Sequence, residues 1–187
     1  NNKKIKMSTN SVQTKEGALI LDSHKLSYHI DRIKAWEAGE RIAPVSVDMA
    51  LTRSCGAMCS FCYAMMQEPQ ERSSIKTDHS LQLLDDFAEI GVKGVSLISD
   101  GESTLSKAYV PFIQHAHKLG IDIGNATNAW EWEPEKIEQV LPYMSWVRFT
   151  VAAGRPESYS KIMFKGPEHT HVFDRAMKHI KYAVDLK

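Results

Sequence analysis

The three cysteines of the chain, Cys55, Cys59 and Cys62, all lie on one short stretch. An odd number of thiols cannot pair fully into disulfides, and a closed site of four thiolates would need one more cysteine. Thiolates are soft ligands that suit iron–sulfur clusters and zinc. Three of them on a tight loop can hold three corners of a cubane cluster, so that its fourth iron is left for another ligand. The spacing therefore indicates a metal centre with one open position.

Two other interpretations of the cysteine stretch stay open at this point. A zinc site of three cysteines and one histidine would need a histidine close to the loop, and the next one along the chain is His79. Three inert, buried thiols would rarely cluster so tightly. A non-catalytic iron–sulfur or zinc module, acting in electron transfer or protein interaction, is thus the alternative to an enzyme.

The hydrophobic pattern predicts the elements that must position these cysteines. It indicates strands over 45–51, 94–99, 121–125 and 146–152, and helices over 24–38, 78–91, 110–120, 134–141 and 173–184. Strands that alternate with helices through short connections are parallel, with right-handed crossovers and with helices on one face of the sheet or on both. The cysteines then follow the carboxyl end of the first strand, which is where parallel α/β folds bind ligands.

Four βα units are too few for a closed barrel, which needs eight. The fourth strand would also be left with an unpaired edge, and long bare edges invite wrong pairing. We therefore predict an α/β fold of the partial (βα) TIM-like barrel type. Further sequence at the C-terminus or a partner chain would complete this barrel; the alternative is a small open sheet. Residues 1–23 are expected to form a flexible tail, and residues 24–187 the core.

The composition is that of an ordinary globular protein, and its charge balance bears on whether the protein binds nucleic acids or membranes. The 23 basic residues equal the 23 acidic ones, so the net charge does not indicate a nucleic acid or an anionic membrane. No apolar run has the length of about 20 residues needed to span a bilayer. The polar, basic start is not a secretory signal. Clustered cysteines without such a signal predict a reducing, cytoplasmic location.

The cysteine motif resembles that of the radical S-adenosylmethionine (radical SAM) superfamily, C-x3-C-x-aromatic-C, with Phe61 as the aromatic residue before Cys62. The resemblance implies a [4Fe–4S] cluster on the three cysteines. The amine and carboxylate of S-adenosylmethionine would chelate the open iron. An electron from an external donor such as a flavodoxin or ferredoxin would then cleave a carbon–sulfur bond, and the 5′-deoxyadenosyl radical would take hydrogen from an unidentified substrate. A degenerate member that binds S-adenosylmethionine without cleaving it is a further alternative.

A second resemblance lies after the second predicted strand. The superfamily often has Gly-Gly-Glu-Pro there, in contact with the amino group of S-adenosylmethionine, and Gly101 and Glu102 match it. A glycine lets the backbone approach a ligand, and a carboxylate accepts hydrogen bonds from an ammonium group. Asp100 and Ser103 depart from the pattern, and Asp100 leaves open which acid makes the contact. A plain surface turn is the structural alternative.

The segment after the third predicted strand resembles the Thr-Asn-Gly that many relatives have near the ligand. Thr127 and Asn128 match this pattern, and Ala129 replaces the glycine. Asn125 is a further candidate to point towards the ligand. A turn with an asparagine in the left-handed conformation is the structural alternative.

The fourth predicted strand resembles the R-x-S-x-D-G region of relatives that act in molybdenum-cofactor synthesis and peptide modification. The chain is closest in pattern to that branch. Thr150 stands at the hydroxyl position near the ribose or carboxylate, and Arg148 is a candidate for the carboxylate or for a structural ion pair. Ala153 replaces the usual acidic residue, and Arg155 is expected at the surface.

Overall fold

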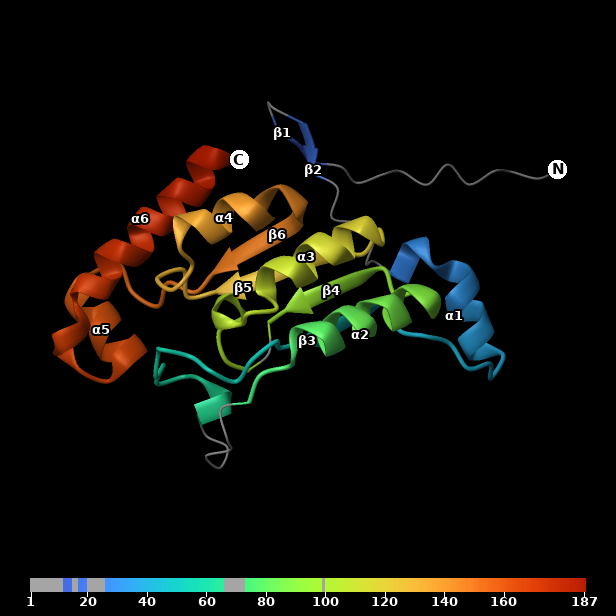
Figure 1. The fold of residues 1–187 in the computed structure, drawn as a ribbon, viewed down its shortest axis with the longest axis horizontal. Coiled ribbons are helices and arrows are strands. Elements are labelled where there is room, and N and C mark those ends of the chain that lie inside the picture. The colour runs from blue at the N-terminus through green and yellow to red at the C-terminus, as the bar shows by residue number, and fades with distance from the viewer. Residues whose placement is uncertain (1–11, 15–16, 20–25, 66–72, 99) are drawn as a thin grey trace.

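The computed structural model describes residues 12–14, 17–19, 26–65, 73–98 and 100–187. Its centre is a four-stranded sheet in the order β3-β4-β5-β6 (Figure 1). All three neighbouring pairs in this sheet are parallel. Four parallel strands that alternate with helices confirm the predicted α/β class.

The four predicted strands are all present, with ends that differ by a few residues. The sheet is formed by β3 (Ser46–Met49), β4 (Gly94–Leu97), β5 (Asp122–Thr127) and β6 (Met144–Phe149). The strand expected over 146–152 begins and ends earlier, so Thr150 follows the strand. Residue 99, which ended the second predicted strand, lies outside the described residues.

A small hairpin precedes the core and was not predicted. Strand β1 (Val12–Thr14) pairs with β2 (Gly17–Leu19) in antiparallel fashion. Both strands lie within residues 1–23, for which the expectation of a flexible tail stays a prediction. The other residues of the predicted tail, 1–11, 15–16 and 20–23, lie outside the described residues.

The predicted helices are present, and one further helix was missed. They are α1 (Ile30–Glu37), α2 (Thr77–Glu89), α3 (Tyr109–Lys118), α4 (Pro134–Val140) and α6 (His171–Leu186), with the short turn Leu26–Tyr28 before α1. The missed helix is α5 (Pro156–Phe164), in which Tyr159, Ser160, Met163 and Phe164 are buried at helical spacing. Gly91 and Gly120 have the positive φ that ends a helix, as predicted.

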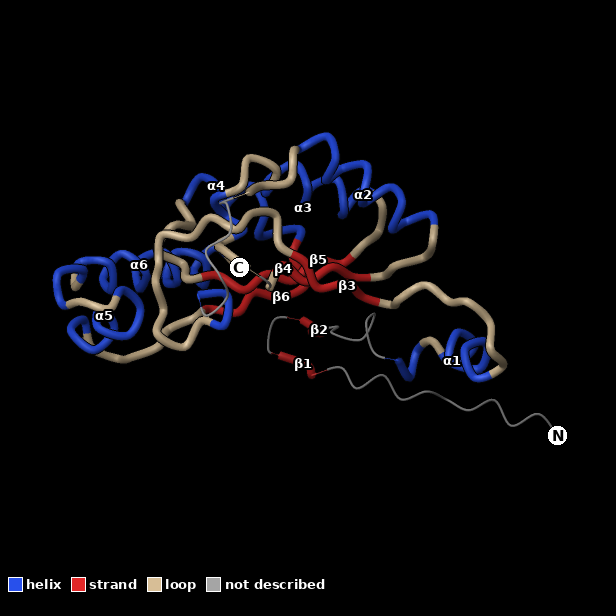
Figure 2. Tube along the Cα trace, turned by 90° about the horizontal axis from the view of Figure 1, so that it is seen from below, coloured by secondary structure: helices blue, strands red, loops and turns tan. Residues whose placement is uncertain are grey.

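Helices α2, α3 and α4 lie side by side over one face of the sheet (Figure 2). The strand residues on that face are apolar, and Val95, Leu97 and Ile123 are fully buried in the main core. Alternation along each strand sends the next residue to the opposite face. There, Asp48, Ser96, Gly124 and Trp146 follow one another in register across the four strands.

The face away from the helices is shaped by one glycine. A Cβ atom on Gly124 would lie 2.0 Å from Cε2 of Trp146, so the indole packs directly on the glycine backbone. Trp146 is half-buried. This face is thus partly covered by a large side chain of β6 and is otherwise lined by small and polar residues.

Candidate active site

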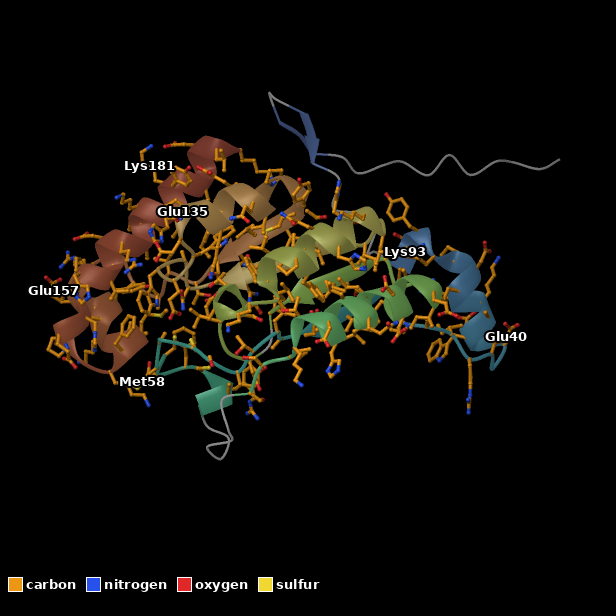
Figure 3. The ribbon with its side chains drawn as sticks, viewed as in Figure 1. Glu40, Met58, Lys93, Glu135, Glu157 and Lys181 are labelled. Atoms are coloured by element: carbon orange, nitrogen blue, oxygen red, sulfur yellow. The ribbon has the colours of Figure 1, made fainter. Side chains whose placement is uncertain are left out.

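The first cysteine, Cys55, lies three residues after the short bridge at Thr52 that follows β3, at the carboxyl edge of the sheet. The end of α5 holds the cysteine loop through two backbone hydrogen bonds. The N–H of Met58, labelled near α5 in Figure 3, donates to the carbonyl of Met163 over 2.8 Å. The N–H of Ser60 donates to the carbonyl of Ile162 over 2.9 Å. The last turn of a helix has carbonyls without intrahelical partners, and here the cysteine loop satisfies two of them.

The thiols are half-buried and lie in a negative environment. Burial raises the pKa of Cys55 to about 12, and negative charge on Glu102 and Glu131 adds to the rise. Burial also raises the pKa of Cys59 to about 11, with further contributions from Cys62 and Glu102. Thiolates in this setting need a cationic partner, which a bound metal centre provides.

Glu102 is the buried acid of the site, at 3% exposure. Its Oε1 accepts hydrogen bonds from Thr104 Oγ1 at 2.8 Å and Thr127 Oγ1 at 2.9 Å, and its Oε2 accepts from the N–H of Asn128 at 2.8 Å. Burial raises the pKa of Glu102 above its ordinary value, and these hydrogen bonds limit the rise. Oε2 retains capacity for a further donor, because each carboxylate oxygen can accept about two hydrogen bonds.

Gly101 brings the Glu102 turn against the start of the cysteine loop. Its φ is +68°, and a Cβ atom there would lie 2.2 Å from the carbonyl oxygen of Thr52. The N–H of Glu102 donates to the carbonyl of Ser54 over 2.8 Å. Only a glycine fits this close backbone approach, and the contact places the carboxylate of Glu102 next to the thiols.

One cavity joins almost all the predicted site residues. It is lined by Cys55, Cys59, Phe61, Cys62, Gly101, Glu102, Thr127, Asn128, Arg148 and Thr150. The N–H of Thr150 donates to the carbonyl of Thr127 over 2.9 Å, which keeps the ends of β5 and β6 together. Segments distant in the sequence thus meet at the carboxyl edge of the sheet, as expected for parallel strands.

Asn125 is the exception among the predicted residues. It does not line this cavity; its Nδ2 donates to the hydroxyl of Tyr109 on α3 over 3.1 Å. The structure thus does not bring Asn125 to the cavity with the other predicted residues. Asn125 lies on the same face of β5 as the core residue Ile123, since side chains two apart along a strand share a face.

The structure also separates the two acids that follow β4. Asp100 pairs with Arg53, with 3.5 Å between Nε and Oδ2, and it does not line the cavity. Glu102 is thus the acid that faces the ligand cavity. Arg148 is exposed on the cavity side at the end of β6.

Several residues of the cavity were missed by the sequence analysis. They are Ala57, Tyr63, Leu97, Ile98, Ser103, Ala126 and Met163. Tyr63, Ser103 and Ala126 each neighbour a predicted residue, so the strand ends themselves were the available signal for these three. Met163 was out of reach because helix α5 was not predicted; its sulfur lies 3.5 Å from Cys59 Sγ.

Ala129 occupies the position where the family pattern has glycine, and it keeps the backbone conformation of a glycine. Its φ is +65°. The left-handed conformation costs an alanine about 1–2 kcal/mol. His179 on α6 lies against this turn, with Nδ1 3.0 Å from the carbonyl oxygen of Ala129. The departure from the motif thus leaves the shape of the turn intact.

The donor set of the site suits a metal centre held by thiolates, because three half-buried thiols line one cavity. Tyr159 Oη and Trp130 Nε1 are buried without a hydrogen-bond partner among the described residues. Both side chains pack in the apolar group that includes Cys55 and Cys59, but neither lines the cavity.

As they lie in the described part of the chain, no three or more histidine, cysteine, aspartate or glutamate side chains, the three cysteines included, form a group that could hold a metal ion. His115 is paired with Asp85, with 2.7 Å between Nε2 and Oδ1. None of the helices described here is both long and apolar enough to cross a membrane. The cytoplasmic location stays a prediction.

Known proteins show the same combination of fold and motif. The sequence profile of the Radical SAM superfamily matches residues 49–187. The sporulation killing factor maturation protein SkfB of Bacillus subtilis is 27% identical over 95 residues, which are 51% of this chain and 23% of SkfB. A PqqA peptide cyclase of Rhodopseudomonas palustris is 28% identical over 127 residues, which are 68% of this chain and 30% of that protein.

The fold is similar to that of SuiB of Streptococcus suis. The crystal structure of SuiB bound to the precursor peptide SuiA gives a TM-score of 0.64 at 18% identity, over 84% of this chain and 34% of SuiB. SuiB bound to S-adenosylmethionine also gives 0.64, at 19% identity, over 84% and 36% of the two chains. This chain therefore spans between 23% and 36% of SkfB, the PqqA peptide cyclase and SuiB.

These similarities confirm the predicted partial TIM-like barrel and the likeness to the peptide-modifying branch. The family implies S-adenosylmethionine and an iron–sulfur cluster as cofactors. Because the family profile matches well over half of its length, from residue 49 to residue 187, the chain belongs to the radical SAM superfamily.

Proposed function

We propose that this protein is a radical SAM enzyme whose cofactors meet in the cavity at the carboxyl edge of the sheet. The three thiols of the cysteine loop would hold a [4Fe–4S] cluster. The polar groups at the ends of β4, β5 and β6 would hold S-adenosylmethionine. The observation that carries this proposal is that the thiols and the buried carboxylate of Glu102 line one cavity.

The residues of the chain have separable tasks in this proposal. Glu102 accepts a hydrogen bond from the ammonium group of S-adenosylmethionine, whose positive charge offsets the cost of keeping a carboxylate buried. Arg148 is placed to pair with the carboxylate of the ligand. Thr127, Asn128 and Thr150 supply donors and acceptors for its other polar groups. Phe61, 54% exposed, forms a wall of the cavity.

The bound cofactors supply a radical that abstracts hydrogen from the substrate, after an electron arrives from an external donor. The chain itself contributes a lining of low polarity around the thiols. Ala57, Leu97, Ile98, Ala126 and Met163 are apolar and restrict water at the cavity. A flavodoxin or ferredoxin stays our prediction for the donor.

We further propose that the substrate is a peptide. Two similar proteins are a PqqA peptide cyclase and SuiB, the latter solved with a precursor peptide. The exposed Arg148 and the half-buried Trp146 lie on the face of β6 away from the helices, so a peptide lying across the open face of the sheet would meet both. Oxidation, epimerisation, rearrangement and bond formation are the outcomes open to such a peptide after hydrogen abstraction.

Anaerobic reconstitution with iron and sulfide tests the cofactor assignment. The wild type is expected to show the electron paramagnetic resonance (EPR) signal of a reduced [4Fe–4S] cluster, which changes when S-adenosylmethionine is added. Dithionite should then yield 5′-deoxyadenosine. The variants C55S, C59S and C62S should each lose the cluster, whereas S60A on the same loop should keep it, because Ser60 uses its backbone N–H.

Three outcomes would contradict the proposal in different ways. Tetrahedral zinc without a response to S-adenosylmethionine would favour a binding module. An intact cluster that binds S-adenosylmethionine but yields no 5′-deoxyadenosine would favour a degenerate member. A cluster retained in all three cysteine variants would remove these thiols from the ligand set.

A further inference from the structure

Glu131 lies where two loops of the candidate site meet. Its Oε2 accepts a hydrogen bond from the N–H of Gly56 over 3.3 Å and another from Nδ2 of Asn128 over 2.9 Å. Gly56 belongs to the cysteine loop, and Asn128 to the loop after β5. A single carboxylate oxygen thus bridges the segment that carries the thiols and the segment that lines the ligand side of the cavity.

The contact between Glu131 and the cysteine loop is tight. A Cβ atom on Gly56 would lie 2.4 Å from Oε1 of Glu131 and 2.6 Å from Cζ2 of Trp130. The glycine therefore allows the cysteine loop to lie directly on the segment after β5. The N–H of Trp130 donates to the carbonyl of Asn128 over 2.9 Å, and this turn brings Glu131 back beside Asn128.

The carboxylate of Glu131 also lies close to the thiols. Its Oε2 is 3.3 Å from the backbone nitrogen of Gly56, the residue that follows Cys55 in the chain. Both of its hydrogen-bond donors here are neutral N–H groups, so they do not cancel its charge. A negative charge beside a metal centre opposes the addition of an electron.

We propose that Glu131 is a positioning residue of the site, which fixes the cysteine loop relative to Asn128 and lowers the reduction potential of the cluster bound by that loop. This inference rests on the proposed function. The two effects have different origins. The positional effect needs an acceptor oxygen, and the effect on the potential needs the negative charge. Two substitutions can therefore separate them.

Glutamine keeps an acceptor oxygen and removes the charge, whereas alanine removes both. In E131Q and E131A we expect the midpoint potential of the reconstituted cluster, measured by EPR-monitored redox titration, to rise to a similar extent. Only E131A should bind S-adenosylmethionine more weakly, by about tenfold, which corresponds to the loss of a hydrogen bond at the site. Affinity is measured from the change in the EPR signal during titration with S-adenosylmethionine.

Glu133 offers the matched control. This glutamate lies two residues further along and pairs with Arg175 and, at 3.8 Å, with His179, both on α6. The variant E133Q should leave the potential and the affinity unchanged. Circular dichroism melts show whether each variant is folded.

Two results would overturn the inference. The first is a midpoint potential in E131Q that equals that of the wild type, or a rise in E133Q as large as the rise in E131Q. The other is an affinity in E131A equal to that in E131Q. A wild type that takes up no cluster contradicts the proposed function instead. If the wild type takes up the cluster, and the Glu131 variants have its midpoint potential and its affinity for S-adenosylmethionine, only the role of Glu131 is contradicted.

Discussion

At the scale of single residues, the central feature is a carboxylate that is 3% exposed and lies in the wall of the cavity. Glu102 is buried, and its ionised form is supported by Thr104, Thr127 and the N–H of Asn128. Burial of a charge without full compensation destabilises the ionised form. The site is thus prepared for a cation, and the ammonium group of S-adenosylmethionine is one.

The variant E102Q tests the effect of this burial. The pKa of Glu102 in the folded state is raised above its ordinary value of 4.5, so the folded protein holds the proton more tightly than the unfolded chain. The contribution of Glu102 to stability therefore falls as pH rises from this value through the folded-state pKa. In urea unfolding of the cluster-free protein, the wild type should lose stability relative to E102Q as the pH rises above the ordinary pKa of 4.5. If the difference in the free energy of unfolding between the wild type and E102Q does not change with pH, burial does not raise the pKa of Glu102.

Gly101 gives a second prediction at this scale. A methyl group there would meet the backbone of Thr52 and Arg53, and the φ of +68° is itself unfavourable for alanine. We expect G101A to lower the free energy of unfolding by about 3 kcal/mol and to weaken the binding of S-adenosylmethionine.

Gly39 is the control for Gly101. Its φ is +84°, but a Cβ atom there would have no neighbour within 4 Å. G39A should therefore cost only about 1 kcal/mol in urea unfolding. If G101A and G39A lose the same free energy of unfolding, the close approach of Gly101 to the backbone of Thr52 and Arg53 does not contribute to stability.

At the scale of elements, helix α5 decides where the thiols lie. Two carbonyls of its last turn accept hydrogen bonds from the cysteine loop, and Met163 packs beside Cys59. Helix α6 then supports the turn at Ala129 through His179. Two helices that carry none of the family's motifs thus hold the loops that do.

The end of α5 predicts substitutions of opposite effect. Lys165 follows the helix with a φ of +63°, a conformation that favours glycine. K165G should raise the free energy of unfolding by about 1 kcal/mol, because the strain exceeds the entropy that a glycine adds to the unfolded chain. K161G, at an exposed position inside the same helix, should lower it by about 1 kcal/mol. Thermal melts check both variants, and a destabilised K165G would contradict the assignment of strain.

At the scale of the whole molecule, the sheet is open. Among the described residues, β3 and β6 are the edge strands, and β4 and β5 lie between them. Unpaired edges are a risk that proteins usually cover. In the part of the chain that the structure describes, no strand pairs with the outer side of β6.

Amide hydrogen exchange tests the state of these edges in solution. The amides of β4 and β5 should exchange slowest, because both neighbours hydrogen-bond to them. The amides of β6 that point away from β5 should exchange at least about tenfold faster. Protection of β6 equal to that of β5 would mean that its outer edge is paired in solution.

Much of this molecule was predictable from its sequence, because the signals were local. Alternation placed the four strands in order, glycines marked the ends of α2 and α3, and the cysteine motif fixed the site. Parallel strands share one carboxyl edge, so motifs at successive strand ends had to converge there. For the same reason, Glu102, Thr127, Asn128 and Thr150 line the cavity with the thiols.

The tertiary structure decided what depends on contacts between distant segments. Only the packing of α3 shows that Asn125 faces Tyr109, and only the approach of Arg53 separates Asp100 from Glu102. The bridge from Glu131 to Gly56 joins residues 75 positions apart. Sequence periodicity reports which face of an element is buried, but a hydrogen bond between two loops depends on coordinates that no local pattern contains.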